Sequence, residues 1–248
     1  MVAAAQSENP FDEPAPAKAA PAVRGGGGRP AAYKTKDGKR VPGVTTVTKR
    51  FQESGGLIRW AFNCGRDGID MDRVRDDAAD AGHIAHGWVD DTIHGRQLKE
   101  HPELTEDQLA GPRNALSAFV EWRDQVKLEI IATEVPLISE ELRFGGTFDA
   151  LFRIKGRLVL GDWKSGNRVY GEHLAQLGGY AILIEETGFL EQFGGGTLDG
   201  AQLLRFDKEF GSFAQFSWPK PVLELGKTAF RQMRSLYDVC QRLGKAVG

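Results

Sequence analysis

Two strand-like runs separated by a turn stand out in the middle of the chain. Residues 147–154 and 157–164 are rich in residue types that favour β-strands. Lys155-Gly156 lies between the two runs and predicts a short hairpin turn. If the loop is symmetric about this pair, Leu151 faces Leu160 across the hairpin. A three-residue loop with a bulge would shift the pairing by one residue, so both registers are open from the pattern alone.

Apolar residues elsewhere recur mostly with a helical period. Residues 72–94 place Val74, Ala81 and Ala85 on one face of a predicted helix. Other helices are expected near Leu57, after residue 168 and at 222–245, and other strands at 130–138, at 201–206 and as a hairpin at 33–42. Strands interspersed with helices predict one α/β domain, with a central mixed β-sheet flanked by helices.

Residues 98–127 contain signals for both a helix cap and a turn. Thr105 and Gln108 fit a capping box at the start of a helix. Gly111-Pro112 is a turn signal. We therefore expect a short helix after Thr105 and a separate helix at 113–127. A further turn is expected at 165–168, after the second strand of the central hairpin.

The first 30 residues differ in composition from the remainder of the chain. Residues 1–30 are rich in Ala, Pro and Gly and show no periodicity, which predicts a disordered leader without a catalytic role. Residues 31–248 are expected to form the folded domain. No apolar run approaches the roughly 18 residues of a membrane helix, and the start lacks a signal-peptide pattern. We therefore expect a cytoplasmic protein that does not associate with membranes.

Charge and cysteine content narrow the possible functions. The formal net charge is −2, so any contact with nucleic acid needs a local basic patch. Residues 34–40 contain four basic side chains, which form either a solvated hairpin or an edge that contacts phosphates. Cys64 and Cys240 are the only cysteines and are far apart, so neither a disulfide framework nor a zinc ribbon is indicated.

The central hairpin carries the candidate chemistry. In the symmetric register Asp149 faces Asp162, and two like charges so placed need a shared proton or a compensating cation. A divalent metal held by oxygen ligands would supply that cation. Lys164 lies two residues after Asp162 and therefore points to the same face. Its ammonium group could orient an attacking water, help to deprotonate it, or stabilise negative charge as it develops.

Three short motifs together resemble the PD-(D/E)xK nuclease superfamily, and in particular its RecB-like exonuclease group, which includes Cas4 and many phage exonucleases. Gly146-Thr147-Phe148-Asp149 is similar to the Gly-x-x-Asp motif of that group. Asp162-Trp163-Lys164 is similar to its Asp-x-Lys motif. The run from Gln176 to Tyr180 is similar to its Gln-x-x-x-Tyr motif. The resemblance covers roughly residues 30–240.

The resemblance implies a restriction-endonuclease-like core and a site for Mg²⁺ or Mn²⁺. Its metal ligands would be Asp149, Asp162, the Trp163 carbonyl and a histidine. Gly82 and His86 match the Gly-x-x-x-His motif of the group, which points to His86 as that ligand. The residue after the glycine is His83, where the motif often has Thr or Ser, so His83 is a second candidate. Without the resemblance, either histidine would be read as an ordinary hydrogen-bonded residue.

The remaining candidate residues have supporting roles. Lys164 would assist the nucleophile, and Gln176 and Tyr180 would hold the substrate strand. Asp90 lies one helical turn after His86 and could orient its imidazole. Glu134 is either an exposed strand carboxylate or a supporting acidic residue, as in related nucleases. Cas4 proteins use four cysteines for an iron–sulfur cluster, so no such cluster is expected with two.

The expected activity is metal-dependent hydrolysis of DNA phosphodiester bonds, by an exonuclease of phage or bacterial recombination, replication or repair. If phage-encoded, the protein would act in the host cytoplasm, with a recombination or single-strand-binding protein as a candidate partner. Two alternatives are a non-catalytic nucleic-acid-binding module on the same fold and a structural subunit that binds another protein. The sequence leaves open the oligomeric state, the polarity, and the choice between exonuclease and endonuclease.

Overall fold

The computed structural model describes residues 23–24, 30–52, 55–164, 169–206 and 213–248. The turn predicted at 165–168 lies outside these residues, as does most of the predicted leader. Within that leader, Val23–Arg24 forms a two-residue strand, β1, beside Ala132 and Thr133.

The centre of the fold is a mixed sheet with the order β1-β4-β5-β6-β7-β8. The β4–β5, β5–β6 and β7–β8 pairs are antiparallel, whereas β1–β4 and β6–β7 are parallel. The sheet confirms the predicted α/β class, although the last strand, β8, was not foreseen. After β1 the strands of this sheet are β4 Glu129–Ser139, β5 Phe144–Ile154, β6 Arg157–Lys164, β7 Gly200–Phe206 and β8 Phe213–Pro219, and the separate hairpin is β2 Tyr33–Lys34 with β3 Arg40–Val41.

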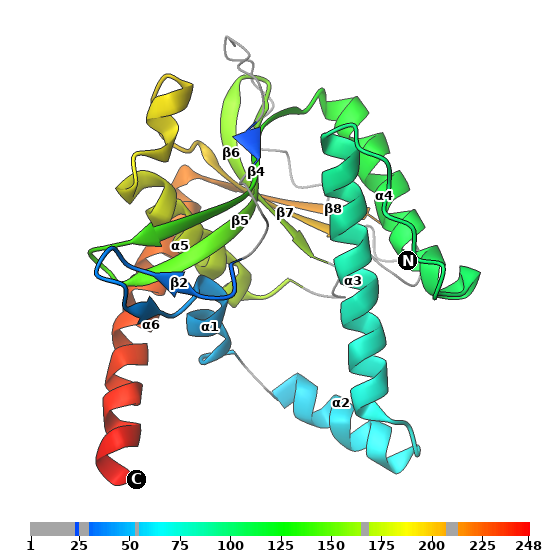
Figure 1. Ribbon diagram of the computed structural model, residues 1–248, viewed down its shortest axis with the longest axis horizontal. Helices are drawn as coiled ribbons and strands as arrows, with labels where there is room; N and C mark the ends of the chain where they lie inside the picture. The colour runs from blue at the N-terminus through cyan, green and yellow to red at the C-terminus, as the bar shows by residue number, and fades with distance from the viewer. Residues whose placement is uncertain (1–22, 25–29, 53–54, 165–168, 207–212) are drawn as a thin grey trace.

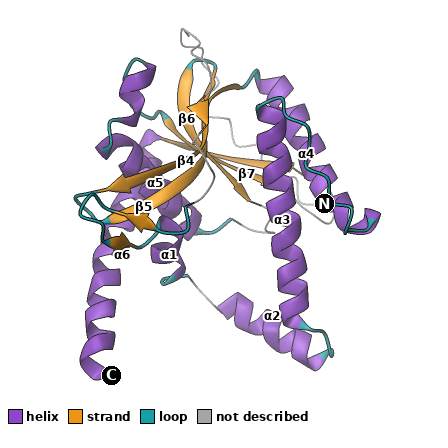
Figure 2. Cartoon of the chain, viewed as in Figure 1, coloured by secondary structure: helices purple, strands orange, loops and turns teal. Residues whose placement is uncertain are grey.

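Helices cover both faces of this sheet (Figures 1 and 2). Helices α1, α5 and α6 pack on one face, and α3 and α4 lie on the other, where α4 contacts β7 and β8. Helix α2 contacts α3 and lies away from the sheet (Figure 1). The helices are α1 Val44–Lys49, α2 Gly55–Arg66, α3 Met71–Ile93, α4 Glu106–Val126, α5 Gly171–Glu186 and α6 Lys220–Val247, with a 3-10 helix at Phe189–Phe193.

Each face of the sheet has its own hydrophobic core. Beneath α5 and α6, Leu158, Leu160 and Phe230 belong to one cluster of buried side chains. Beneath α3 and α4, Val159 and Trp163 belong to a second cluster. Alternation along β6 thus sends successive side chains into different cores, which is why this strand reads as a nearly continuous apolar run.

The central hairpin has the symmetric register expected from its sequence. Leu151 pairs with Leu160, and Ile154 pairs with Arg157 across a two-residue turn. Lys155 and Gly156 have φ values of 50° and 79°. Positive φ at both central positions is the requirement of the type I′ turn, whose twist matches that of the flanking strands. The two-residue turn therefore excludes the shifted register.

The prediction of two helices between residues 105 and 127 was wrong. Thr105 does form the expected capping box with Gln108, but α4 then continues without a break to Val126. Pro112 lies inside this helix, where it removes one backbone hydrogen bond. The buried side chains before and after Pro112 lie on a single helical stripe. This stripe packs against α3 at Leu109 and against the sheet core from Ala115 onward, and the packing outweighs the missing bond. This stripe consists of Leu109, Pro112, Ala115, Phe119 and Trp122.

Helices α5 and α6 approach each other closely at two glycines. A Cβ atom on Gly178 would lie 2.2 Å from the carbonyl carbon of Gly226, and a Cβ atom on Gly226 would lie 2.5 Å from the Leu174 carbonyl oxygen. Both contacts are with backbone, which cannot move aside as a flexible side chain can. The two glycines therefore determine how closely α6 packs against α5.

Gly178→Ala should lower the free energy of unfolding by about 1–3 kcal/mol, because the added methyl group overpacks a helix contact. The matched change Gly244→Ala, in a helical position with nothing within 4 Å of the added carbon, should instead raise it by up to about 1 kcal/mol through helix propensity. Urea unfolding measures both values. Stabilisation by both changes would contradict the close helix contact.

Within the described ranges, no helix combines the length and apolar character needed to cross a membrane.

Candidate active site

Asp162 and Lys164 lie on the same face of β6, as predicted from strand alternation. That face is the one covered by α5, because Leu158 and Leu160 of the same strand belong to the core on that side. The Asp162 side chain is 1% exposed, and its Oδ2 atom lies 2.6 Å from Lys164 Nζ. A buried carboxylate is therefore paired with a partly buried ammonium group.

Trp163, between these two residues, anchors the end of β6 on the opposite face. Its ring makes an edge contact with Phe119 at 5.6 Å between centroids and stacks at 6.3 Å on Phe152. Both partners are fully buried. This packing fixes the strand end from which Asp162 and Lys164 project.

Asp149 reaches the site from β5, where regular pairing with β6 has just ended. The last described pair is Ala150 with Gly161, and beyond it Asp149 Oδ2 accepts a hydrogen bond of 2.9 Å from the Trp163 backbone N–H. Phe148 and Leu151 both belong to the core beneath α5, although strict alternation would place residues three apart on opposite faces. Asp149 therefore lies at a local irregularity of the strand.

Gln176 and Tyr180 of α5 complete a buried polar cluster around Asp162. Gln176 Nε2 donates to Asp162 Oδ1 at 3.0 Å and to the Tyr180 hydroxyl at 3.2 Å. Both side chains are almost fully buried, and buried polar groups need such partners. The structure thus directs their polar atoms towards Asp162, and the substrate contacts expected of them stay a prediction.

The close packing of Tyr180 also explains the glycine of the Gly-x-x-Asp motif. A Cβ atom on Gly146 would lie 2.8 Å from Tyr180 Cε1 and 2.8 Å from a methyl group of Val44. A larger residue at position 146 would displace the tyrosine that contacts Gln176. This glycine is therefore needed for space rather than for a left-handed backbone.

His86 joins the site from α3, at the end of β6. It is partly buried, and the Trp163 backbone and the charges of Lys164 and Asp162 act on it. Burial, supported by the Lys164 charge, lowers the pKa of His86 to about 4, so its imidazole is neutral at pH 7. His83, one turn earlier, is exposed, and its charge adds slightly to this lowering.

The electrostatics of Asp162 show that the two carboxylates are close enough to interact. Burial raises the pKa of Asp162 to about 6; the Lys164 ammonium opposes this shift, and the negative charge of Asp149 adds to it. Two carboxylates placed in this way benefit from a positive charge between or beside them. In this structure Lys164 supplies that charge.

His173, in the first turn of α5, lies on the helix face of Gln176 and Tyr180, and the sequence assigned it no role. Burial and then the Lys164 charge lower the pKa of His173, while Asp162 opposes the shift. Its ring Nδ1 accepts a hydrogen bond from the Tyr170 backbone N–H at 3.2 Å. Its position one turn before Gln176 was the only signal available in the sequence.

Glu134 lies level with Asp149 on the neighbouring strand. It falls between the pairs Thr133–Ala150 and Val135–Phe148, and its φ is 50°. A left-handed backbone is uncommon for residues other than glycine and is found preferentially at functional sites. This conformation draws attention to Glu134, whose supporting role stays a prediction.

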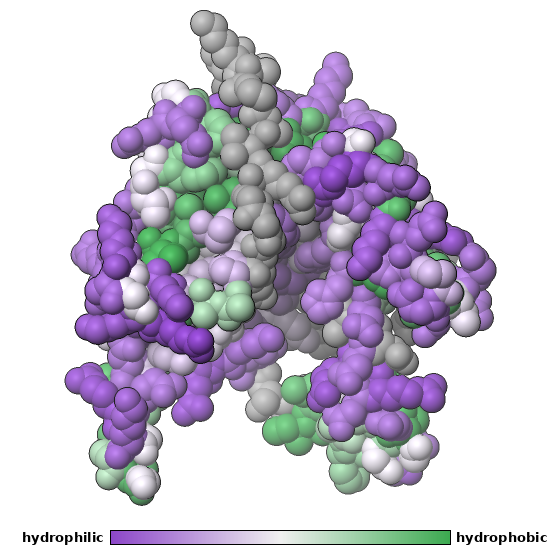
Figure 3. Space-filling view, viewed as in Figure 1, coloured by the Kyte–Doolittle hydropathy of each residue, from purple (hydrophilic) through white to green (hydrophobic). Residues whose placement is uncertain are grey.

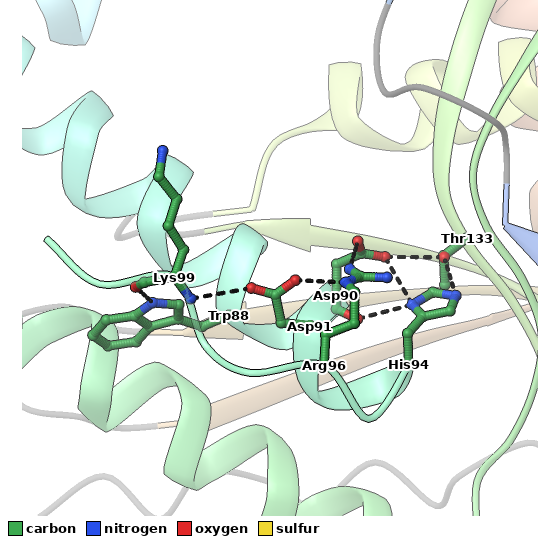
Figure 4. A network of polar contacts seen from close by, with 7 residues as sticks. All are labelled: Trp88, Asp90, Asp91, His94, Arg96, Lys99 and Thr133. Atoms are coloured by element: carbon green, nitrogen blue, oxygen red, sulfur yellow. Dashed lines mark hydrogen bonds and ion pairs between the residues drawn. The ribbon is translucent and has the colours of Figure 1, made fainter.

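Asp90 takes part in a polar network at the end of α3 (Figure 4). Its carboxylate accepts a hydrogen bond from Thr133 Oγ1 at 3.1 Å and pairs with Arg96 and His94. Asp91 also pairs with Arg96. The network ties the end of the helix that carries His86 to β4, next to Glu134. The role predicted for Asp90 in orienting His86 itself stays a prediction.

The donor groups at this site are of the types that bind hard divalent cations: two carboxylates, a neutral imidazole and the Trp163 carbonyl. The buried, interacting carboxylates fit a cation of this kind. In the conformation described here, however, no three His, Cys, Asp or Glu side chains among the described residues are grouped as a metal site. One oxygen atom of Asp149 accepts from Trp163, and both oxygen atoms of Asp162 have protein partners.

Comparison with known proteins establishes the family. A family model described as the PD-(D/E)XK nuclease superfamily matches residues 50–237. Since the match covers most of the chain, this protein belongs to the PD-(D/E)XK nuclease superfamily. No curated protein matches the sequence.

Solved structures with a similar arrangement include two of LHK-Exo. One is LHK-Exo in complex with dAMP, with a TM-score of 0.31, 14% identity and coverage of 69% of this chain and 92% of that chain. Another is the alkaline exonuclease LHK-Exo from Laribacter hongkongensis, with a TM-score of 0.32, 14% identity and coverage of 67% and 86%. SSO0001 matches with a TM-score of 0.26, 14% identity and coverage of 58% and 82%.

Proposed function

We propose that this protein is a nuclease that uses Mg²⁺ or Mn²⁺ to hydrolyse DNA phosphodiester bonds. We further propose that it acts as an exonuclease of the RecB-like group, in phage or bacterial recombination, replication or repair. Membership of the nuclease superfamily supports the reaction class. The assignment to a metal-dependent exonuclease of the RecB-like group rests on the three motifs of the sequence and on the site built around Asp162.

The observation that carries the proposal is the buried Asp162–Lys164 pair, with Asp149 reaching the same strand end from β5. Burying a carboxylate whose pKa is raised towards neutrality is unfavourable for stability alone. Buried ionisable groups with strongly shifted pKa values are typical of catalytic sites.

Each residue has a definite task in this proposal. Asp149, Asp162, His86 and the Trp163 carbonyl would hold the divalent ion, which when bound polarises the phosphate and lowers the pKa of a water molecule. Gln176 holds one oxygen atom of Asp162 in place. Lys164 stands beside the other oxygen atom, where its ammonium group can orient the attacking water or stabilise charge on the phosphate. The neutral imidazole of His86 leaves a lone pair free to act as a ligand.

The test is digestion of end-labelled linear DNA beside covalently closed circular DNA, with Mg²⁺ or Mn²⁺ and with EDTA. Metal-dependent loss of the linear DNA alone is the expected result. Cleavage of the circle would keep the nuclease but overturn the exonuclease assignment. No cleavage of either DNA, combined with retention of DNA at low salt, would favour the non-catalytic binding module instead.

Asp149→Asn provides an internal control for that assay. The asparagine side-chain oxygen can still accept the Trp163 hydrogen bond, so the fold is preserved while the carboxylate charge is lost. Asp124→Asn, an exposed carboxylate on α4, is the matched substitution away from the site. Only the first change should remove activity.

A further inference from the structure

Helix α6 has two apolar faces, and only one of them is covered. The inner face packs against α5 and the sheet through buried residues that include Leu223, Gly226 and Phe230. A second set of large apolar side chains on the same helix is exposed to solvent. This set consists of Leu225, Leu236, Val239, Leu243 and Val247, with exposed fractions of 64%, 49%, 36%, 58% and 87%. An ordinary surface helix has a single apolar stripe directed to the core.

All members of the exposed set except Val247 follow the spacing of a coiled-coil helix. Starting from Leu225, positions taken alternately four and three residues apart repeat every seven residues. These positions, which we call the outer seam, are Leu225, Ala229, Gln232, Leu236, Val239, Leu243 and Ala246. Six of the seven are apolar. A 3.5-residue period sustained over three heptads indicates a partner that is itself a helix.

The first part of the outer seam, up to Arg234, is held on the body of the protein. Lys227 bonds to Glu185 of α5, and Arg234 donates to the Arg143 carbonyl oxygen at 3.0 Å. Beyond Arg234 no residue of α6 is buried, and this half of the helix extends away from the sheet (Figure 1). Figure 3 shows hydrophobic residues, in green, at the C-terminal end of this helix. The anchored part of the seam is fixed before binding and loses little conformational entropy when a partner docks.

We propose that the outer seam pairs with the outer seam of a second copy of this chain, so that the protein is a dimer. In coiled coils the positions flanking the seam choose the partner by their charges. Here most of them are uncharged, and Arg242 is the one exception: the flanking residues are Gly226, Thr228, Met233, Ser235, Cys240, Arg242 and Val247. The charges at these flanking positions therefore favour no oppositely charged partner helix. They also repel a second copy of the same helix only weakly. A seam that pairs with itself forms a closed twofold interface.

The test is the molar mass of the full chain, measured by sedimentation equilibrium in a reducing buffer, since Cys240 lies beside the seam. The wild-type protein should show twice the 27.2 kDa of one chain at micromolar concentration. Leu236→Glu with Leu243→Glu should weaken this association by at least about 100-fold. Both leucines are exposed in the single chain, so circular dichroism and thermal unfolding of the double variant should remain close to wild type.

Phe62→Glu is the matched control, because Phe62 is exposed to 68% on α2, another helix with uncovered apolar side chains. It should leave the dimer intact. The proposal is overturned if the wild type is a monomer at about 100 µM, or if the Leu236→Glu/Leu243→Glu protein still forms a dimer. Loss of the dimer in Phe62→Glu alone would also overturn it and would place the interface on α2. None of these outcomes depends on whether the protein cleaves DNA.

Discussion

Asp162→Asn should abolish metal-dependent DNA cleavage and at the same time make the metal-free protein more stable at neutral pH. Cleavage should fall by at least about 10³-fold, because the charge that holds the divalent ion is lost. Asparagine keeps an oxygen atom that can accept the hydrogen bond from Gln176 Nε2. The contact with Gln176 is therefore kept, whereas the asparagine Nδ2 atom replaces the Oδ2 atom that pairs with Lys164 Nζ. Circular dichroism of the variant checks that a loss of activity does not reflect unfolding.

The gain in stability follows from the pKa of this carboxyl. Burial raises the pKa of Asp162 from its ordinary value of 3.8 to about 6, so the folded protein holds this proton more tightly than the unfolded chain. Above about pH 6 the side chain is ionised in both states, and its burial lowers the stability of the fold. Each unit of pKa shift corresponds to roughly 1.4 kcal/mol. We expect Asp162→Asn to raise the free energy of unfolding by about 1–3 kcal/mol at pH 7.

The pH dependence distinguishes this explanation from improved packing. The difference between wild type and variant should be full above about pH 6, shrink as the pH falls, and disappear below the ordinary pKa of 3.8, where Asp162 is protonated in both the folded and the unfolded state. Urea unfolding in EDTA at several pH values measures it, with Asp124→Asn as the control. If Asp162→Asn were less stable than the wild type at neutral pH, burial of the ionised Asp162 carboxylate would not be destabilising the fold.

Lys164→Met should lower kcat by about 10²–10⁴-fold with little change in KM. Methionine has a similar length, but it removes the ammonium group beside Asp162 Oδ2. If Lys164 acts on the nucleophile or on the charge that develops during the reaction, its loss affects the chemical step rather than substrate binding. Lys245→Met, at an exposed position of α6, is the matched control.

Stability measurements separate the structural and catalytic contributions of Lys164. Lys164→Met should destabilise the wild-type background by about 1–3 kcal/mol at pH 7, because ionised Asp162 loses its partner. The same change should cost much less in the Asp162→Asn background. Lys164→Arg keeps the charge and should largely restore stability, but its larger planar group should not restore kcat. Full activity of Lys164→Met would remove this residue from the mechanism.

Local patterns were sufficient for much of the fold and for part of the site. The two-residue turn at Lys155-Gly156 set the hairpin register, because a type I′ turn allows only one pairing of the strands. Strand alternation then placed Asp162 and Lys164 on one face. Residues two apart on a strand share a face whatever the rest of the chain does.

Tertiary packing decided the features that connect distant parts of the chain. Pro112 stays helical because the stripe around it is buried against α3 and the sheet, which no local signal reports. Asp149 leaves regular alternation and accepts a hydrogen bond from the Trp163 backbone, while His86 arrives at the same strand end from α3. These contacts depend on how the layers pack.

The sequence alone thus determined which types of side chain the site contains and the order of Asp162 and Lys164 along β6. Only the three-dimensional packing decided their protonation and their partners. Burial beneath α5 raises the pKa of Asp162, and burial between α3 and the end of β6 lowers that of His86, because removal from water disfavours the charged form of each group. Turn geometry and strand alternation act over a few residues, whereas desolvation depends on every element that packs around a side chain.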